Sequence, residues 1–218
     1  MFSNKADCKM KIIFRSTLLI FFFLVIFSSS NIAQRFNAGL MLGGVVSQVD
    51  GDTYSGYTKF GYLGGAYVGL QVSPHSSFQM ELEYIQKGSR NDTNATGITS
   101  YLLRIHYIEV PILYQYTFKR RFYFEAGPAM DIYIGSLEMK DGLQVDGVPF
   151  RAVCFSGIFG FGAYVTKHLR LNLRANYSLN SLRSQNDYGY YRRMLFERGQ
   201  YNNVLSLSVL WDFKAKDL

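Results

Sequence analysis

Hydrophobic and polar residues alternate along much of the chain with the two-residue period of a β-strand. In FQMELEY, residues 78–84, the even-numbered positions are apolar or aromatic and the odd-numbered positions are Gln or Glu. In RLNLRANYSL, residues 170–179, the odd-numbered positions take most of the apolar side chains and the even-numbered positions take Arg, Asn and Ser. Because successive side chains of a strand point to opposite faces, the pattern predicts strands with one apolar and one polar face.

Turn signals divide the chain beyond residue 33 into eight such segments, which are rich in aromatic and β-branched residues. The predicted strands are residues 36–48, 60–72, 78–88, 100–118, 121–135, 150–165, 168–182 and 200–213. Short connections such as SPHS and KR alternate with long polar ones such as DGDTYSGYTK and SRNDTNATGIT. An even strand number with this alternation is typical of outer-membrane barrels. We therefore predict an all-β fold: an eight-stranded antiparallel transmembrane β-barrel with short periplasmic turns and long extracellular loops.

The polar faces of these strands are expected to line the lumen of the barrel. In the second strand the face opposite the apolar side chains carries Gly61, Gly65 and Gly69. Glycine suits the narrow interior of a small barrel better than a solvated exterior. Charges of both signs share this parity, and Arg and carboxylate groups can pair inside a closed barrel. The predicted lumen charge network is Glu81, Glu83, Lys87, Glu109, Glu125, Asp131, Arg170 and Arg174. The alternative, with the apolar faces inside, is a soluble lipocalin-like ligand-binding barrel.

The fourth predicted strand departs from this rule, because Arg104 and His106 share the apolar parity. An Arg or Lys that faces lipid near the bilayer midplane costs roughly 2–4 kcal/mol, so we expect Arg104 and His106 to lie above the membrane. Pro111, in the same strand, has no backbone N–H to donate to a neighbouring strand. We therefore expect a β-bulge at this position. The predicted periplasmic aromatic girdle includes Tyr114, Tyr116, Phe118, Phe122, Trp211 and Phe213.

The beginning of the chain predicts a secretory signal peptide. Basic residues precede an unbroken apolar run, and small polar residues follow it. The run is shorter than the roughly 20 residues that a transmembrane helix needs. We expect cleavage after Ala33, or alternatively after Ser30, and Met10 is an alternative start of translation. The predicted domains are therefore the signal peptide, residues 1–33, and one outer-membrane β-barrel domain, residues 34–218.

Charge and cysteine content narrow the classes of function. The formal net charge of +7 falls to +4 without the signal peptide, and no stripe of Lys and Arg follows it, so a nucleic-acid partner is not expected. Cys154 is the single cysteine beyond residue 33, which excludes an intramolecular disulfide there. The three His residues are scattered and no nucleotide-binding motif appears, so neither a metal nor a cofactor is expected. His106 and Glu109 fall on opposite faces of their strand, and we do not expect an enzyme.

Five segments of the sequence resemble the PorT-like outer-membrane β-barrel family, over essentially the whole chain beyond the signal peptide. In order, they are FNAGLMLGG, GYTKFGYLGGAYV, FQMELEYIQKGS, YIEVPILYQY and FYFEAGPAM. The specific parts are a strand ending in Gln-Lys-Gly, then Tyr-Ile-Glu-Val-Pro, then Glu-Ala-Gly-Pro. The resemblance implies a small outer-membrane barrel and, for the founding member, a part in a secretion system that exports proteins across the outer membrane.

The expected function is that of a non-enzymatic integral outer-membrane barrel with a plugged polar lumen. Its role is expected to be structural or interaction-based, assisting protein export or surface assembly, and the alternative is a small passive pore. The expected partners are outer-membrane lipid and a secretion-system or surface protein, and the barrel itself is expected to be a monomer. Residues 136–149 and 184–199 are the loops expected to make such contacts, since Tyr and Arg are favoured at interfaces. The candidate partner-contact residues are Tyr188, Tyr190, Tyr191, Arg192, Arg193 and Phe196.

Overall fold

The structure is a computed structural model, and one compact unit spans residues 35–218. The part of the chain that it describes is residues 35–51, 56–91, 100–145, 147–183, 192–194 and 197–215. The predicted signal peptide, residues 1–33, lies outside the described residues, so its boundaries stay a prediction. Among the described residues, no helix is long and apolar enough to cross a membrane.

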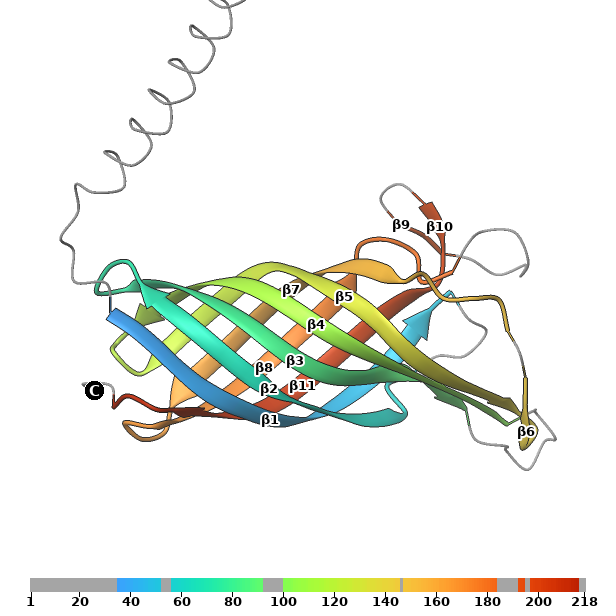
Figure 1. Cartoon of the computed structure of the whole chain (residues 1–218), viewed down its shortest axis with the longest axis horizontal. Helices are drawn as coiled ribbons and strands as arrows, with labels where there is room; N and C mark the ends of the chain where they lie inside the picture. Colours follow the sequence, from blue (N-terminus) through green and yellow to red (C-terminus); the bar gives the residue numbers. More distant parts are fainter. Residues whose placement is uncertain are drawn as a thin grey trace, which may run out of the picture. The chain divides into compact units, whose positions relative to one another are not determined.

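Eight long strands form a closed antiparallel barrel, which confirms the predicted fold class (Figure 1). They are β1 (Arg35–Asp50), β2 (Lys59–Gln71), β3 (Ser76–Asn91), β4 (Tyr101–Phe118), β5 (Phe122–Lys140), β7 (Val153–Tyr164), β8 (Leu169–Ser178) and β11 (Tyr201–Asp212). Three short strands lie in the connections: β6 (Leu143–Gln144), β9 (Arg192–Met194) and β10 (Glu197–Gly199). The first long strand pairs with the last, with Leu42 opposite Val209, and this pairing closes the ring.

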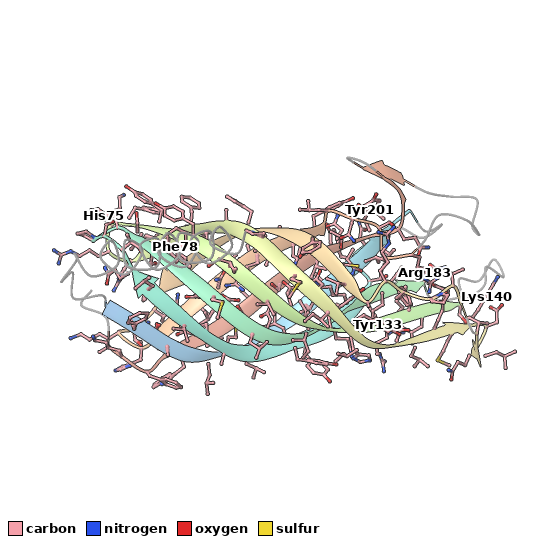
Figure 2. All side chains as sticks on the ribbon, turned by 45° about the horizontal axis from the view of Figure 1, so that its top comes forward. His75, Phe78, Tyr133, Lys140, Arg183 and Tyr201 are labelled. Atoms are coloured by element: carbon pink, nitrogen blue, oxygen red, sulfur yellow. The ribbon has the colours of Figure 1, made fainter. Side chains whose placement is uncertain are left out.

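The two ends of the barrel differ in their connections. The turn rim is formed by the short connections at residues 72–75, 119–121 and 165–168, and the opposite end, with the longer connections, is the loop rim. His75 and Phe78 lie at the turn rim, whereas Arg183, Tyr201 and Lys140 lie towards the loop rim (Figure 2).

β5 continues further than the sequence pattern indicates. Residues 136–140, predicted as loop, extend the strand and pair with the beginning of β4, and β6 folds back on its end. The register of the β4–β5 pair shifts between His106 and Tyr107, because Ile134 has no partner on β4. The bulge expected at Pro111 is absent from this pairing, where Pro111 lies opposite Ala129 in the same register as its neighbours.

Apolar side chains cover the outer surface, and the polar parity of the strands points inward. The exposed apolar set includes Leu40, Leu42, Phe60, Val68, Met80, Leu82, Ile112, Phe159, Leu173, Leu207 and Val209. Inward glycines bring the strands and their side chains close together. A Cβ on Gly65 would lie 2.3 Å from the carbonyl oxygen of Leu82, and one on Gly162 would lie 2.1 Å from the Tyr123 ring. The interior is therefore tightly packed and rich in charged groups.

Candidate functional site

The interior of the barrel holds three layers of paired charges, and the first lies nearest the turn rim. Arg170 of β8 forms an ion pair with Asp212 of β11, with 3.0 Å between Nε and Oδ2. Arg170 Nη2 also donates to Gln79 Oε1 on β3 at 3.2 Å, and the hydroxyl of Tyr67 donates to Asp212 Oδ1 at 2.7 Å. Three tyrosine rings surround the guanidinium carbon: Tyr67 at 4.8 Å, Tyr123 at 5.5 Å and Tyr164 at 5.5 Å.

The second layer is centred on Arg174, which spans the lumen from β8. Its Nη1 and Nη2 atoms donate to the two carboxylate oxygens of Glu81 on β3, both at 2.6 Å. Its Nε donates to Glu125 Oε1 on β5 at 2.5 Å. Asn172 and Gln115 each donate to an oxygen of Glu125 at 2.9 Å. Bidentate arginine–carboxylate geometry is among the strongest hydrogen-bonding arrangements in proteins, so this layer links three walls of the barrel.

The third layer lies around Lys87, whose side chain is completely buried. Its Nζ lies 2.5 Å from Glu109 Oε2 on β4 and 3.1 Å from Asp131 Oδ1 on β5. Asn176 of β8 donates to Glu109 Oε1 at 2.7 Å. The same ammonium lies 5.5 Å from the centre of the Tyr107 ring, within the range of a cation–π contact. Side chains from opposite walls therefore also meet across the lumen at this level.

Apolar side chains continue the filling of the lumen, including positions near the loop rim. The buried cluster includes Val45, Val49, Leu63, Ile85, Leu103, Ile105, Cys154, Leu182 and Val204. Beyond it, Arg183 forms an ion pair with Glu138, and its guanidinium lies 4.1 Å from the centre of the Phe150 ring. Tyr101 donates to the same carboxylate at 2.8 Å. Apolar side chains such as Leu103 and Ile105 thus lie between the third layer and this last ion pair.

The loop rim is also tied across neighbouring strands. Tyr57, in the connection before β2, donates from its hydroxyl to Asn203 Oδ1 of β11 at 2.7 Å. Burial, together with the negative charge of Asp50, raises the pKa of the Tyr57 hydroxyl. The group therefore stays protonated and keeps donating. Tyr177 of β8 donates to Asp50 of β1 at 2.8 Å, and β11 lies between these two strands in the sheet.

The structure brings all eight residues of the predicted lumen charge network into the interior, each at most 3% exposed. Seven of them enter ion pairs, but the partner of Arg170 is Asp212, which the predicted set leaves out. Glu83 lies opposite Glu109 in the β3–β4 pairing, and its Oε2 atom has no hydrogen-bond partner among the described residues. Asp212 and the amide side chains that bond in the lumen lie at the polar positions of their strands. A predicted network that included the amides and the acid of the last strand would therefore have contained them.

The candidate partner-contact residues lie largely beyond the structure. Tyr188, Tyr190, Tyr191 and Phe196 are outside the described residues. Only the backbone of Arg192 and Arg193 is described, and it lies in β9, which pairs with β10. The segment predicted as a loop therefore contains two short strands that pair antiparallel.

The described residues contain no group of metal ligands, and they hold His106 and Glu109 apart. No group of three His, Cys, Asp or Glu side chains there is placed to hold a metal ion. His106 faces outward and its Nδ1 contacts the hydroxyl of Tyr84, whereas Glu109 faces inward and is buried. A base and its orienting carboxylate must lie within hydrogen-bond reach, and these two groups lie on opposite sides of the sheet.

Comparison with known proteins agrees with a barrel that has apolar side chains outside and charged side chains inside. Residues 27–184 match the family described as outer membrane protein beta-barrel domain. The chain belongs to this family. A search of curated proteins gives no match. As a family member, the protein is a transmembrane β-barrel of the outer membrane, and its exposed apolar surface faces lipid.

Two solved structures are similar to this chain at low sequence identity. The crystal structure of Neisserial surface protein A is similar over 81% of this chain and 97% of that chain, with 11% identity and a TM-score of 0.52. Ail of Yersinia pestis, solved in complex with the heparin analogue sucrose octasulfate, covers 82% of this chain and 99% of its own, with 8% identity and a TM-score of 0.46. At 11% identity the likeness to Neisserial surface protein A shows the fold alone.

For this outer-membrane barrel, the turn rim carries aromatic rings suited to a membrane interface. The Phe118 ring stacks on Phe124 and Phe122, with ring centres 5.2 and 5.8 Å apart. Trp211 is half exposed, and its ring stacks on His168 with the centres 5.5 Å apart. Amphipathic aromatic rings are enriched at both interfaces of membrane proteins, so the predicted girdle residues lie where such a belt is needed.

Proposed function

We propose that the protein is a non-enzymatic outer-membrane barrel whose lumen is closed to solutes and whose work is done at the loop rim. Its role is that of a structural or interaction component that assists protein export or surface assembly. The chain reaches the membrane through a cleaved signal peptide. The observation that carries the proposal is the stack of three ionic layers that join opposite walls of the lumen.

The lumen supports this proposal over a passive pore. Eight strands enclose an interior just wide enough for side chains to fill. Arg174 alone joins β8 to β3 and β5 through hydrogen bonds of 2.5–2.6 Å. A solute would have to break these bonds, and separating a buried ion pair costs about 3–5 kcal/mol. Three layers in series make such passage slow.

The hairpin at the end of β5 supports an interaction role for the loop rim. β7 begins opposite Ile132, so the last eight residues of β5 extend beyond that neighbour, with β4 on one side and β6 at the tip. Its surface carries exposed apolar side chains, with Ile134 at 53%, Leu143 at 72% and Val145 at 37%. Apolar groups raised above a barrel are suited to contact with another protein. The resemblance to the PorT-like family suggests that this partner belongs to an export system.

Two measurements test the proposal. Purified protein in planar lipid bilayers should give no discrete conductance steps, while a general porin in the same bilayers should give them. Reproducible steps from the purified protein would show an open pore and overturn the closed-lumen part.

The second measurement compares proteins released into the medium with those retained in the periplasm in a gene-deletion strain. The wild-type copy should restore normal release, and Leu143→Asp on the hairpin should restore it only in part. Thr166→Asp at the turn rim, exposed like Leu143, is the matched control and should behave as wild type. An unchanged set of released proteins in the deletion strain would refute the export role.

A further inference from the structure

A group of basic side chains lies near the loop rim, with Arg104 and His106 facing outward, Arg90 exposed and Lys59 buried. The rim basic patch consists of Lys59 at the beginning of β2, Arg90 near the end of β3, and Arg104 and His106 near the beginning of β4. The positive charges of Arg90 and Arg104 both act on Lys59, and those of Arg104 and Lys59 act on His106. The pairing of β3 with β4 places Gln86 opposite His106 and Gly88 opposite Arg104. Three adjacent strands thus bring positive charges together at one place.

Three members of the patch, Lys59, Arg104 and His106, differ from the lumen arginines in their partners. The acceptors that the described residues offer to Lys59 Nζ are neutral: Gln86 Oε1 at 3.0 Å and the backbone oxygen of Phe60. His106 contacts the hydroxyl of Tyr84. Within the described residues, none of Lys59, Arg104 and His106 forms an ion pair with an acid.

Arg104 carries the observation that points most directly to a ligand at this patch. Its Nε atom is buried and has no hydrogen-bond partner among the described residues. Buried polar groups in proteins are nearly always hydrogen-bonded, so an orphaned arginine donor calls for an explanation. Like charges held close together also repel one another. An anion bound beside Arg104 compensates the charge of a guanidinium that has no acidic partner among the described residues, and it reduces the repulsion at the same time.

The position of the rim basic patch along the barrel axis indicates which class of anion binds there. Immediately towards the turn rim, β4 presents Ile108, Val110 and Ile112 outward, a surface suited to hydrocarbon. Tyr62 and Tyr84 lie next to the patch, with ring centres 5.4 Å apart, as expected for aromatic side chains at a membrane interface. The patch therefore lies where the hydrocarbon ends and the headgroups of the outer leaflet begin.

We propose that the rim basic patch binds the phosphate of a phosphate-bearing lipid in the outer leaflet. Arg104 donates to the phosphate oxygens, since a planar guanidinium fits phosphate geometry. Arg90 and His106 flank the bound headgroup, and the buried Lys59 adds its charge from behind. The acyl chains of the lipid lie along the apolar surface below. This binding goes beyond the proposed export or assembly role, because it needs neither a partner protein nor a cargo.

Native mass spectrometry of the detergent-purified, folded protein tests the proposal. The probe is a diphosphorylated glycolipid of the lipid A type, titrated beside its dephosphorylated form and beside inorganic phosphate. The wild-type protein should retain one phosphorylated lipid, and Arg104→Gln should bind it at least tenfold more weakly. Lys167→Gln, which removes an exposed cation at the turn rim, is the matched control and should bind as wild type. Heat-modifiable migration on gels shows that each variant is folded.

Three results would overturn the proposal. Equal binding of the phosphorylated and dephosphorylated lipids would mean that the acyl chains alone are recognised. Inorganic phosphate that binds as tightly as the lipid would mean a site for a soluble anion. An Arg104→Gln variant with wild-type affinity would mean that the lipid binds elsewhere. Because no cargo or conductance is measured, failure here leaves the proposed function to be judged by its own experiments.

Discussion

Replacing Arg174 with methionine should destabilise the barrel by about 3–5 kcal/mol, the usual cost of removing one partner from a buried ion pair. The guanidinium makes three hydrogen bonds of 2.5–2.6 Å to Glu81 and Glu125, and its side chain is only 3% exposed. Methionine fills much of the same volume but leaves both carboxylates in the lumen without their cation. The folding equilibrium constant should therefore fall by roughly two to four powers of ten.

Urea unfolding of the protein folded in lipid vesicles measures this loss. The single tryptophan, Trp211, lies on the outer surface at the turn rim and reports the transfer from lipid to water. The triple variant Arg174→Met, Glu81→Gln, Glu125→Gln removes the stranded charges as well, and it should recover a large part of the lost stability. Lys167→Met at the exposed turn rim should change little. The reasoning fails if the single variant loses less than about 1 kcal/mol, or if the triple variant is no more stable than the single one.

Three further changes test other parts of the structure. Gly65→Ala should lower the yield of folded barrel and its urea midpoint, because the new Cβ would lie 2.3 Å from a backbone oxygen. Gly44→Ala is the control and should fold as wild type, since a Cβ there has nothing within 4 Å. Equal yields of the two variants would contradict the close approach of the strands at Gly65. Leu207→Arg should cost roughly 2–4 kcal/mol in vesicles if this exposed position faces the bilayer core, and Leu207→Ala clearly less; equal losses would place it outside the core. The buried thiol of Cys154 should react with a maleimide only after unfolding, and rapid labelling of the folded barrel would show an open lumen.

The alternation of apolar and polar residues was sufficient to predict the eight strands and which of their faces point inward. It failed where the period is broken. The unpaired Ile134 shifts the register of β5, so the sequence pattern stops at residue 135 although the strand runs to Lys140. Alternation also gives the face of each residue but not the stagger between strands. Without the stagger, the pairing of Arg170 with Asp212 could not be distinguished from a pairing with any other inward acid.

The rim basic patch is a second feature that the sequence pattern predicts only in part. Arg104 and His106 stood out in the sequence as charges on an apolar face, and the structure places both facing outward, near the loop end of β4. Lys59 gave no such signal, because it belongs to the polar parity of its own strand. It joins the patch through its bond to Gln86 on β3, which depends on the local course of two neighbouring strands.

The ionic layers also determine when the barrel can gain its stability. Arg174 and Glu81 are separated by 93 positions in the sequence, and Arg170 and Gln79 by 91. Such contacts form late, because long segments of chain must be ordered before the ends meet. A sheet that lacks β11 would leave Arg170 without Asp212 and both edges unpaired. The last strand therefore completes the ring and its charge balance in one step, so we expect the barrel to fold in one all-or-none transition that needs the whole chain, after export and not during synthesis.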